Sequence, residues 1–406
     1  MEFQCGFSVA FDSSRANGRS TTFSRDELLS IRPNDIKRFM AFCAFGDPDC
    51  DVAAGHHPTH CRSATLEATK HALSYYMPHR MAPWCNNQGN PARSAPVNDI
   101  VKEVKKFEVR SEGRPSKAKR AVRPNEFRKA INLLQSHSSF DLKYRYPMVC
   151  LWQHHLIGRL DDAANFEIND PTSHPGFNFA LQTKVRWSKN VMEERDCPAQ
   201  IVLAARESAL CTVLNLAIYL EEHLRRTPGA KYLFADDLDD EAPIRLKTNH
   251  RNNMDHHVFK NDDFCQMALD SDEHKGLGTH SFRKGSANKA RKNGVNADEI
   301  EIRGRWKPQG KCVIFCYINV NQVHIDAKVA ALPCPGGPIK YKLKVGLDCV
   351  NDEWLFTNCI PHIHARFSND RAFCRTLGLA TLYAYCEPTL RDLLTDFHRT
   401  RIAAAL

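Results

Sequence analysis

Residues 278–285 read Gly278-Thr279-His280-Ser281-Phe282-Arg283-Lys284-Gly285, and this stretch decides how the second half of the chain is interpreted. His280 and Arg283 are three residues apart, so a helix that begins at Thr279 would carry both side chains on one face. The small residues that follow permit close packing of such a helix. Gly294 predicts its end, and Asn296 predicts the cap of a next helix that runs to Arg305.

Residues with side chains suited to catalysis lie on both sides of this stretch. Upstream, Ile157-Gly158-Arg159-Leu160-Asp161-Asp162 places an arginine next to carboxylates, and downstream Gly304-Arg305-Trp306 is followed by Tyr317. A single His-x-x-Arg pair arises in many chains by chance, whereas the ordered set is far more specific. Taken singly, Tyr317 and Trp306 would be core aromatic residues, and Arg159 with Asp162 a surface ion pair.

The ordered set resembles the C-terminal signature of tyrosine recombinases and phage-type integrases. It is most similar to the crypton-type recombinases of eukaryotic mobile elements, which carry motifs like Ile302-Arg303-Gly304-Arg305-Trp306-Lys307 and Asp326-Ala327-Lys328-Val329-Ala330. The resemblance spans roughly residues 60–330 and is carried mainly by residues 150–330. This chain departs from the pattern in three places: Asp162 replaces the usual Glu, Trp306 replaces the more frequent His, and the interval from Trp306 to Tyr317 is about two residues longer.

The resemblance implies a catalytic role for six residues. Tyr317 would attack a DNA phosphodiester and form a 3′-phosphotyrosyl bond. Arg159 and Arg283 would hold the two non-bridging oxygens, because guanidinium donates in a planar fork and keeps its proton. His280 would accept a proton or bind the phosphate. Trp306 would donate its indole N–H and close the site, and Lys189, on a β-hairpin, would be the general acid. Lys184 is the rival for the last role, and Lys189 taken alone would be a solvated turn residue.

No metal or other cofactor is expected for this chemistry. The tyrosine hydroxyl has a pKa of about 10 and needs cationic surroundings or a base to attack at neutral pH. The arginines and the lysine would supply the positive charge that a metal ion supplies elsewhere.

The bulk composition agrees with a globular protein that binds an anionic partner. The chain has 406 residues, a net charge of +9, 42% hydrophobic and 25% charged residues. An excess of Lys and Arg favours nucleic acid as the partner, although charge alone is weak evidence. The 16 cysteines lack a secreted spacing and the chain opens without a signal-like segment, so a reducing intracellular compartment is expected. The most apolar run, residues 209–220, is too short to span a bilayer.

Hydrophobic periodicity predicts a mostly α fold with a small β-sheet, an α+β architecture. Five parts are expected: a flexible arm over 1–22, a helical core-binding domain over 23–109, a basic linker over 110–124, a catalytic domain over 125–330 and a tail of unknown role over 331–406. Helices are predicted at 24–31, 36–45, 63–76 and 97–109, then at 125–134, 147–156, 207–225, 279–293 and 296–305. Ser24 and Ser63 are expected to cap the first and the third of these helices. A strand is predicted at 177–186 with 200–203 as its partner strand.

The linker is the expected DNA-contacting segment outside the catalytic set. It carries five basic residues that would lie on phosphates, Arg114, Lys117, Lys119, Arg120 and Arg123. The alternative interpretation is a solvated tether with no ligand.

Metal-ligating residues crowd one segment of the first domain, namely Cys43, Cys50, His56, His57, His60 and Cys61. Such side chains can hold zinc. Their spacing matches no common finger, so a zinc site here is the minor alternative.

The resemblance implies a site-specific recombinase that integrates or excises a mobile element. Its partners would be double-stranded DNA and further copies of the chain, four in a synapse, and its location would be the nucleus. Two domains would grip opposite faces of the duplex. The alternatives are a type IB topoisomerase with the same chemistry and a catalytically silent DNA-binding descendant of a mobile element.

Overall fold

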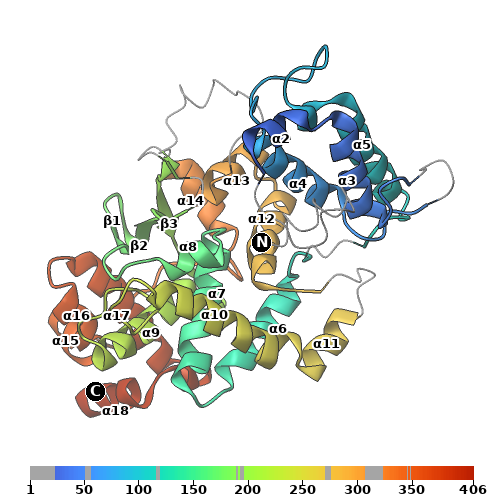
Figure 1. Cartoon of the computed structure of the whole chain (residues 1–406). Helices are drawn as coiled ribbons and strands as arrows, with labels where there is room; N and C mark the ends of the chain where they lie inside the picture. The colour runs from blue at the N-terminus through green and yellow to red at the C-terminus, as the bar shows by residue number, and fades with distance from the viewer. Residues whose placement is uncertain are drawn as a thin grey trace. The chain divides into compact units, whose positions relative to one another are not determined.

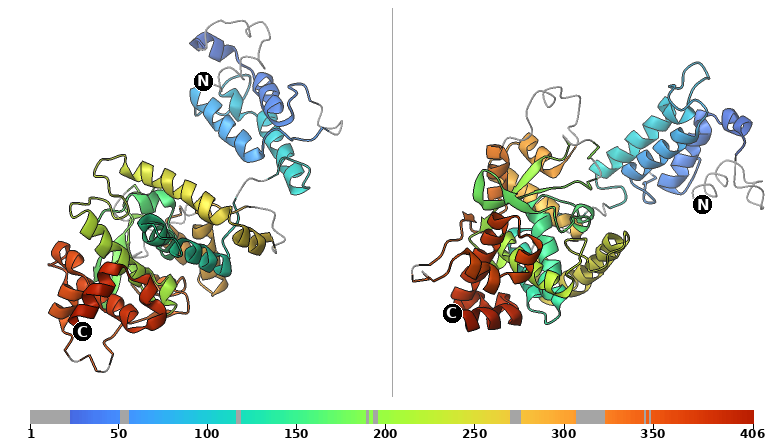
Figure 2. Two further views of the ribbon diagram at one scale, coloured as in Figure 1. Left: turned by 90° about the horizontal axis from the view of Figure 1, so that it is seen from below. Right: turned by 90° about the vertical axis from the view of Figure 1, so that its left-hand side faces the viewer.

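A computed structural model describes residues 23–50, 56–115, 119–188, 191–192, 196–269, 276–306, 323–344, 346–347 and 349–406. The chain divides into two compact units, unit 1 (Met1–Ala118) and unit 2 (Lys119–Leu406) (Figures 1 and 2). The fold is mostly helical with small antiparallel sheets, as the sequence predicts. No helix of the described residues is long and apolar enough to cross a membrane.

Unit 1 contains the four predicted helices. They are α2 (Arg25–Ser30), α3 (Pro33–Phe45), α4 (Ser63–Tyr76) and α5 (Ala95–Val109), with a short 3₁₀ turn at Pro91–Arg93. Ser24 caps α2 through a capping box with Glu27, as expected. Helix α5 packs against both α3 and α4 around one apolar core. The predicted arm, residues 1–22, lies outside the described residues.

The start of α4 differs from the prediction that Ser63 caps it. Arg62 is the residue before the first turn, and Ser63 is the first helical residue. The carboxylate of Glu108 on α5 does the capping instead, because it accepts from the Ser63 backbone N–H at 2.7 Å and from the Ser63 hydroxyl at 3.0 Å. A cap supplied by another helix leaves no local signal in the sequence.

Unit 2 begins with α6 (Pro124–Gln135), α7 (Tyr146–His155) and α8 (Leu160–Ala164), and a π-helical turn at Asp141–Arg145 precedes α7. Its sheet has three antiparallel strands in the order β1 (Thr172–His174), β2 (Phe177–Lys184) and β3 (Ala199–Val202). Strand β2 pairs with β3 so that Lys184 faces Ala199 and Leu181 faces Val202. The predicted strand pair is confirmed, and β1 was not predicted. A second small sheet pairs β4 (Ala204–Ala205) with β5 (Pro338–Ile339).

The middle of unit 2 is helical. Helix α9 (Thr212–Arg226) begins five residues later than the predicted start at Glu207, because Ser208–Leu210 forms a 3₁₀ turn and Cys211 caps the helix. The elements that follow are α10 (Ala242–Met254), a π-helical turn at Asp255–Phe259, α11 (Asp262–Leu269), α12 (Thr279–Lys292), α13 (Ala297–Gly304) and α14 (Val323–Ala331).

The C-terminal residues form helices α15 (Asp352–Asn358), α16 (Pro361–Arg366), α17 (Arg371–Cys386) and α18 (Asp396–Ala405), with a 3₁₀ turn at Pro388–Leu393 before α18. Helix α17 packs on α9 and on β2 (Figures 1 and 2). Apolar side chains such as Phe356, Phe373 and Leu377 belong to the same hydrophobic core as α7 and α9. The segment 331–406, which the sequence sets apart as a tail, is therefore an integral part of unit 2.

Candidate active site

Arg159 lies at the junction of α7 and α8. Helix α7 ends with Ile157 in the left-handed region at φ 50°, and the Gly158 N–H donates to the Gln153 carbonyl at 2.9 Å. This is the helix ending that glycine usually makes, so a β-branched residue there is strained by about 1 to 3 kcal/mol. The turn delivers Arg159 to the start of α8, where its backbone N–H donates to Asp162 Oδ2 at 2.9 Å.

His280 and Arg283 lie in the first turns of α12, as predicted. The Ser281 hydroxyl accepts from the Gly278 backbone N–H at 3.0 Å and fixes the start of the helix. Gly285 lets the helix lie against the preceding chain, because a Cβ there would be 2.5 Å from the Val122 carbonyl oxygen. Gly294 ends the turn after α12 at φ 83°, also as predicted.

Trp306 follows α13 and covers Arg283. The helix ends with Arg305 in the left-handed region at φ 55°, and the Trp306 N–H donates to the Glu301 carbonyl at 3.0 Å. The Arg283 guanidinium lies 4.2 Å from the centre of the Trp306 ring, and its Nη2 donates to the Gly304 carbonyl. A Cβ on Gly304 would be 2.0 Å from the Trp306 ring, so the ring can keep this position only beside a glycine.

Asp162 connects the three arginines of the cluster. Its carboxylate is 2% exposed, and Oδ2 lies 3.2 Å from Arg305 Nη2 and 3.8 Å from Arg283 Nη1. Among the residues that the structure describes, Arg283 Nη1 has no hydrogen-bond partner although it is buried. A buried guanidinium nitrogen in that state is costly, and an anion beside it would relieve the cost.

The surroundings shift the pKa values of two candidate residues. Burial first, and then the positive charges of Arg159 and Arg305, lower the pKa of Arg283 to about 9, while Asp162 opposes this shift. Partial burial and the charges of Arg283 and Arg159 lower the pKa of His280. At neutral pH Arg283 is charged and His280 is a neutral imidazole that can accept a proton.

The β2–β3 connection reaches the same cluster. Ser188 accepts a hydrogen bond from Arg159 Nη1 at 3.3 Å, and its side chain is buried. Lys184 is the last residue of β2 and is half-buried. Lys189, the neighbour of Ser188 in the chain, lies outside the described residues, as does Tyr317. The structure therefore brings together Arg159, His280, Arg283 and Trp306 and leaves the positions of the other two candidates undescribed.

The basic linker divides between the two units. Arg114 belongs to unit 1 and donates to the His60 carbonyl, and Lys117 lies outside the described residues. In unit 2 the chain runs beside the start of α12: the Arg120 N–H donates to the Gly276 carbonyl at 3.3 Å, and Lys119 and Arg123 are exposed.

Arg120 does not match the expected role of a phosphate ligand. Its side chain is buried and paired with the buried carboxylate of Glu126, with Nη2 at 2.5 Å from Oε1 and Nη1 at 2.8 Å from Oε2. The Glu126 carboxylate also accepts from the Arg123 backbone N–H at 2.8 Å. The Arg120–Glu126 pair thus fixes the chain where α6 begins, and its charge is already compensated.

The candidate zinc ligands of unit 1 are Cys43, Cys50, His56, His57, His60 and Cys61. Within the part of the chain that the structure describes, no group of three or more His, Cys, Asp or Glu residues is arranged to hold a metal ion. Burial, and then the charge of Cys43, raise the pKa of the Cys61 thiol to about 11.

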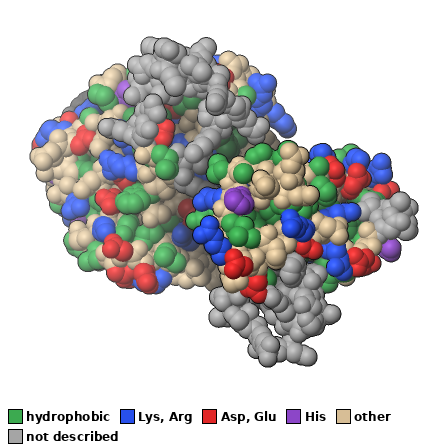
Figure 3. All heavy atoms as spheres, turned by 45° about the horizontal axis from the view of Figure 1, so that its top comes forward, with side chains coloured by type: hydrophobic (Ala, Val, Ile, Leu, Met, Phe, Trp, Pro, Cys, Tyr) green, Lys and Arg blue, Asp and Glu red, His purple; other side chains and the backbone are tan. Residues whose placement is uncertain are grey.

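On the face that Figure 3 presents, Lys and Arg side chains are interspersed with Asp and Glu side chains.

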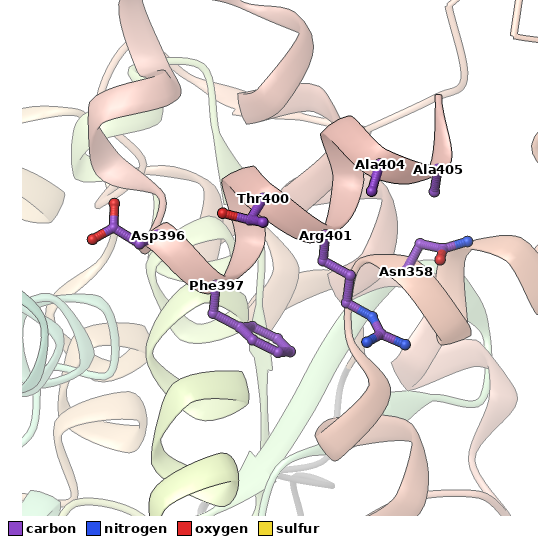
Figure 4. Close-up of a pocket in the computed structure, with 7 residues that line it drawn as sticks. All are labelled: Asn358, Asp396, Phe397, Thr400, Arg401, Ala404 and Ala405. Atoms are coloured by element: carbon purple, nitrogen blue, oxygen red, sulfur yellow. The ribbon is translucent and has the colours of Figure 1, made fainter.

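A pocket of about 660 Å³ lies between α15 and α18 (Figure 4). Phe397, Arg401 and Asn358 line it, and Arg401 Nε donates to the Thr357 carbonyl at 2.8 Å. Its described lining includes none of Arg159, His280, Arg283 and Trp306, so the pocket is separate from the arginine cluster.

No family model matches this chain, and no curated protein matches it. The assignment of the site therefore rests on its sequence motifs and its geometry.

Two members of the cluster, Arg305 and Ser188, have no role in the sequence prediction. The available signal for Arg305 was its place directly before Trp306, where a charged side chain must either reach solvent or find a buried partner.

Proposed function

We propose that the chain cleaves and rejoins DNA by the chemistry of tyrosine recombinases. The observation that carries the proposal is that Arg159, before α8, lies close to His280 and Arg283 of α12. The buried Nη1 of Arg283 has no hydrogen-bond partner among the described residues. A phosphodiester is the anion that two arginines and a neutral imidazole are suited to bind.

In the proposed reaction the Tyr317 oxygen attacks the phosphorus and the bond to the 5′ oxygen breaks. Arg159 and Arg283 offset the charge that grows on the non-bridging oxygens, and His280 accepts the tyrosine proton or binds the phosphate. Lys189 returns a proton to the 5′ oxygen. The assignment of Lys189 rather than Lys184 is supported by the contact between Ser188 and Arg159. The 3′-phosphotyrosyl bond conserves the energy of the diester, so rejoining reverses the same steps.

The proposal extends to the biological setting that the resemblance implies. The substrate is double-stranded DNA, four copies act in a synapse, and the protein works in the nucleus on the ends of a mobile element. Lys119 and Arg123, both exposed beside the start of α12, would add phosphate contacts. Positive charge from the arginines makes a divalent metal unnecessary for cleavage.

Trapping a covalent complex tests the proposal. Duplexes tiled across the DNA that flanks the gene, each with one nick, release a short fragment on cleavage and so trap the attached protein. We expect a band that survives denaturation with the wild-type chain and is lost with Arg283→Ala, which removes the charged phosphate ligand. DNA binding without any adduct would favour the silent descendant. Adducts together with relaxation of supercoiled plasmid, but without joining of two duplexes, would favour a type IB topoisomerase.

A further inference from the structure

Arg305 occupies a conformation that an arginine rarely adopts. Its φ of 55° is in the left-handed region, where glycine or asparagine usually ends a helix. The side chain is buried, with only 2% of its surface exposed. Both features cost free energy, so contacts of the guanidinium must offset them.

The contacts of Arg305 hold it against Asp162. Nη2 lies 3.2 Å from Asp162 Oδ2, and Nη1 donates to Gln200 Oε1 at 3.1 Å and to the Arg303 carbonyl at 2.9 Å. Strand β3 and helix α13 thus fix the direction of the guanidinium. Asp162 receives its nearest positive charge from this residue.

Arg283 competes for the same carboxylate. Its Nη1 lies 3.8 Å from Asp162 Oδ2, which is beyond hydrogen-bond distance. Without Arg305, the buried charge of Asp162 would have Arg283 as its closest cation, and a shift of less than 1 Å would close that pair. The pair would then occupy the nitrogen that a ligand needs.

We propose that Arg305 is a positioning residue, which holds Asp162 so that Arg283 Nη1 stays available to a phosphate oxygen. The inference rests on the proposed function for the identity of the ligand, a phosphodiester. In this arrangement Arg305 neutralises the Asp162 carboxylate, whereas Arg283 binds the substrate.

A double-mutant cycle with inorganic phosphate as the probe tests this role. The full chain, Arg305→Gly, Asp162→Asn and the double variant are titrated with phosphate, and the affinity is taken from the rise in melting temperature. Glycine suits the left-handed backbone, so Arg305→Gly should keep the fold. We expect Arg305→Gly to weaken phosphate binding about tenfold or more, the effect of losing one hydrogen bond to a charged group.

Asp162→Asn should rescue the loss. With the carboxylate charge gone, nothing withdraws Arg283, so the double variant should bind phosphate within about threefold of the wild type. Arg305→Lys, which keeps a charge beside Asp162, should also stay near the wild type and serves if Arg305→Gly does not fold. A variant Arg305→Gly that melts earlier but binds phosphate normally would overturn the proposal, as would equal binding by Arg305→Gly and Arg305→Lys.

The phosphate titrations and the trapping of a covalent DNA complex test separate claims. A wild-type chain that forms a DNA adduct but does not respond to phosphate would overturn the role of Arg305 and leave the proposed function intact. A chain that shows the predicted rescue but never forms an adduct would support the role of Arg305 and contradict the proposed cleavage.

Discussion

Arg303 and Asp326 form an ion pair with 2.5 Å between Nη1 and Oδ1, and they lie at the two ends of the segment that carries Tyr317. Arg303 Nη2 also donates to the carbonyls of His155 and Ile201 at 3.1 and 2.9 Å. Asp326 Oδ2 accepts from the Ile201 N–H at 2.5 Å. The two motifs on which the crypton resemblance is based are thus joined to each other and to β3.

Loss of this pair should destabilise the fold. Arg303→Leu removes the ion-pair partner of Asp326 and one donor to the carbonyls of His155 and Ile201, and breaking a buried pair costs about 3 to 5 kcal/mol. Urea unfolding followed by far-UV circular dichroism measures the change. Lys328→Ala is the matched control, because Lys328 pairs with Glu299 at 3.3 Å with half of its side chain exposed, and it should cost less than about 1 kcal/mol. Equal effects of the two changes would refute a structural role for the Arg303–Asp326 pair.

DNA cleavage should slow at acid pH because of His280. Its pKa is lowered, so the imidazole is neutral at pH 7 and gains a proton only as the pH falls below the ordinary value near 6.5. The protonated ring cannot accept the tyrosine proton, and kcat/KM should fall about tenfold for each pH unit below that lowered pKa. Single-turnover rates of adduct formation give the profile, within the pH range where circular dichroism shows a native fold. His280→Gln should be slow and lack the acid limb; a limb that persists would assign it to another group.

The salt dependence of DNA binding should separate the linker residues. Changing Lys119 and Arg123 together to Gln should reduce the slope of log affinity against log salt by about two units, because each phosphate contact contributes about 0.9. Arg120→Gln should leave the slope unchanged and destabilise the fold, since its charge is paired with Glu126 in the interior. Fluorescence anisotropy at several salt concentrations provides the slopes. An unchanged slope in the Lys119 and Arg123 double variant would show that this part of the linker does not contact phosphates.

Gly304→Ala should damage the site through Trp306. The added methyl group overlaps the indole ring, so the ring must leave its place over Arg283 at a cost of about 1 to 3 kcal/mol. We expect a loss of adduct formation larger than the loss of DNA affinity. Gly229→Ala is the control, because a Cβ there meets no atom within 4 Å. Full adduct formation by Gly304→Ala would show that the position of Trp306 does not matter.

Local signals predicted the elements that carry the site. Asn296 precedes α13 and its backbone N–H donates to Glu299, and Gly294 has the positive φ that its position after α12 suggested. The residue patterns at 177–186 and 200–203 likewise predicted the strands β2 and β3. Each of these features depends on residues within a few positions of one another, which is the range over which sequence patterns act.

Contacts between distant segments were not predictable in this way. Arg305 and Asp162 are 143 residues apart in the chain and meet only because unit 2 folds as a whole. The sequence places Arg120 in a basic linker, but its side chain is buried and paired with Glu126. The sequence sets residues 331–406 apart as a tail, because no local pattern indicates that the helices formed there complete the core around α9.

The most direct test of the account is to identify the residue that becomes attached to DNA. The covalent complex is trapped on the nicked duplex, digested with protease and nuclease, and the modified peptide is sequenced by mass spectrometry. Tyr317→Phe is the matched variant, because it removes only the attacking oxygen and should bind DNA within a few-fold of the wild type while forming no adduct. The account predicts a nucleotide on Tyr317. A nucleotide on any other residue, or an undiminished adduct in Tyr317→Phe, would contradict it.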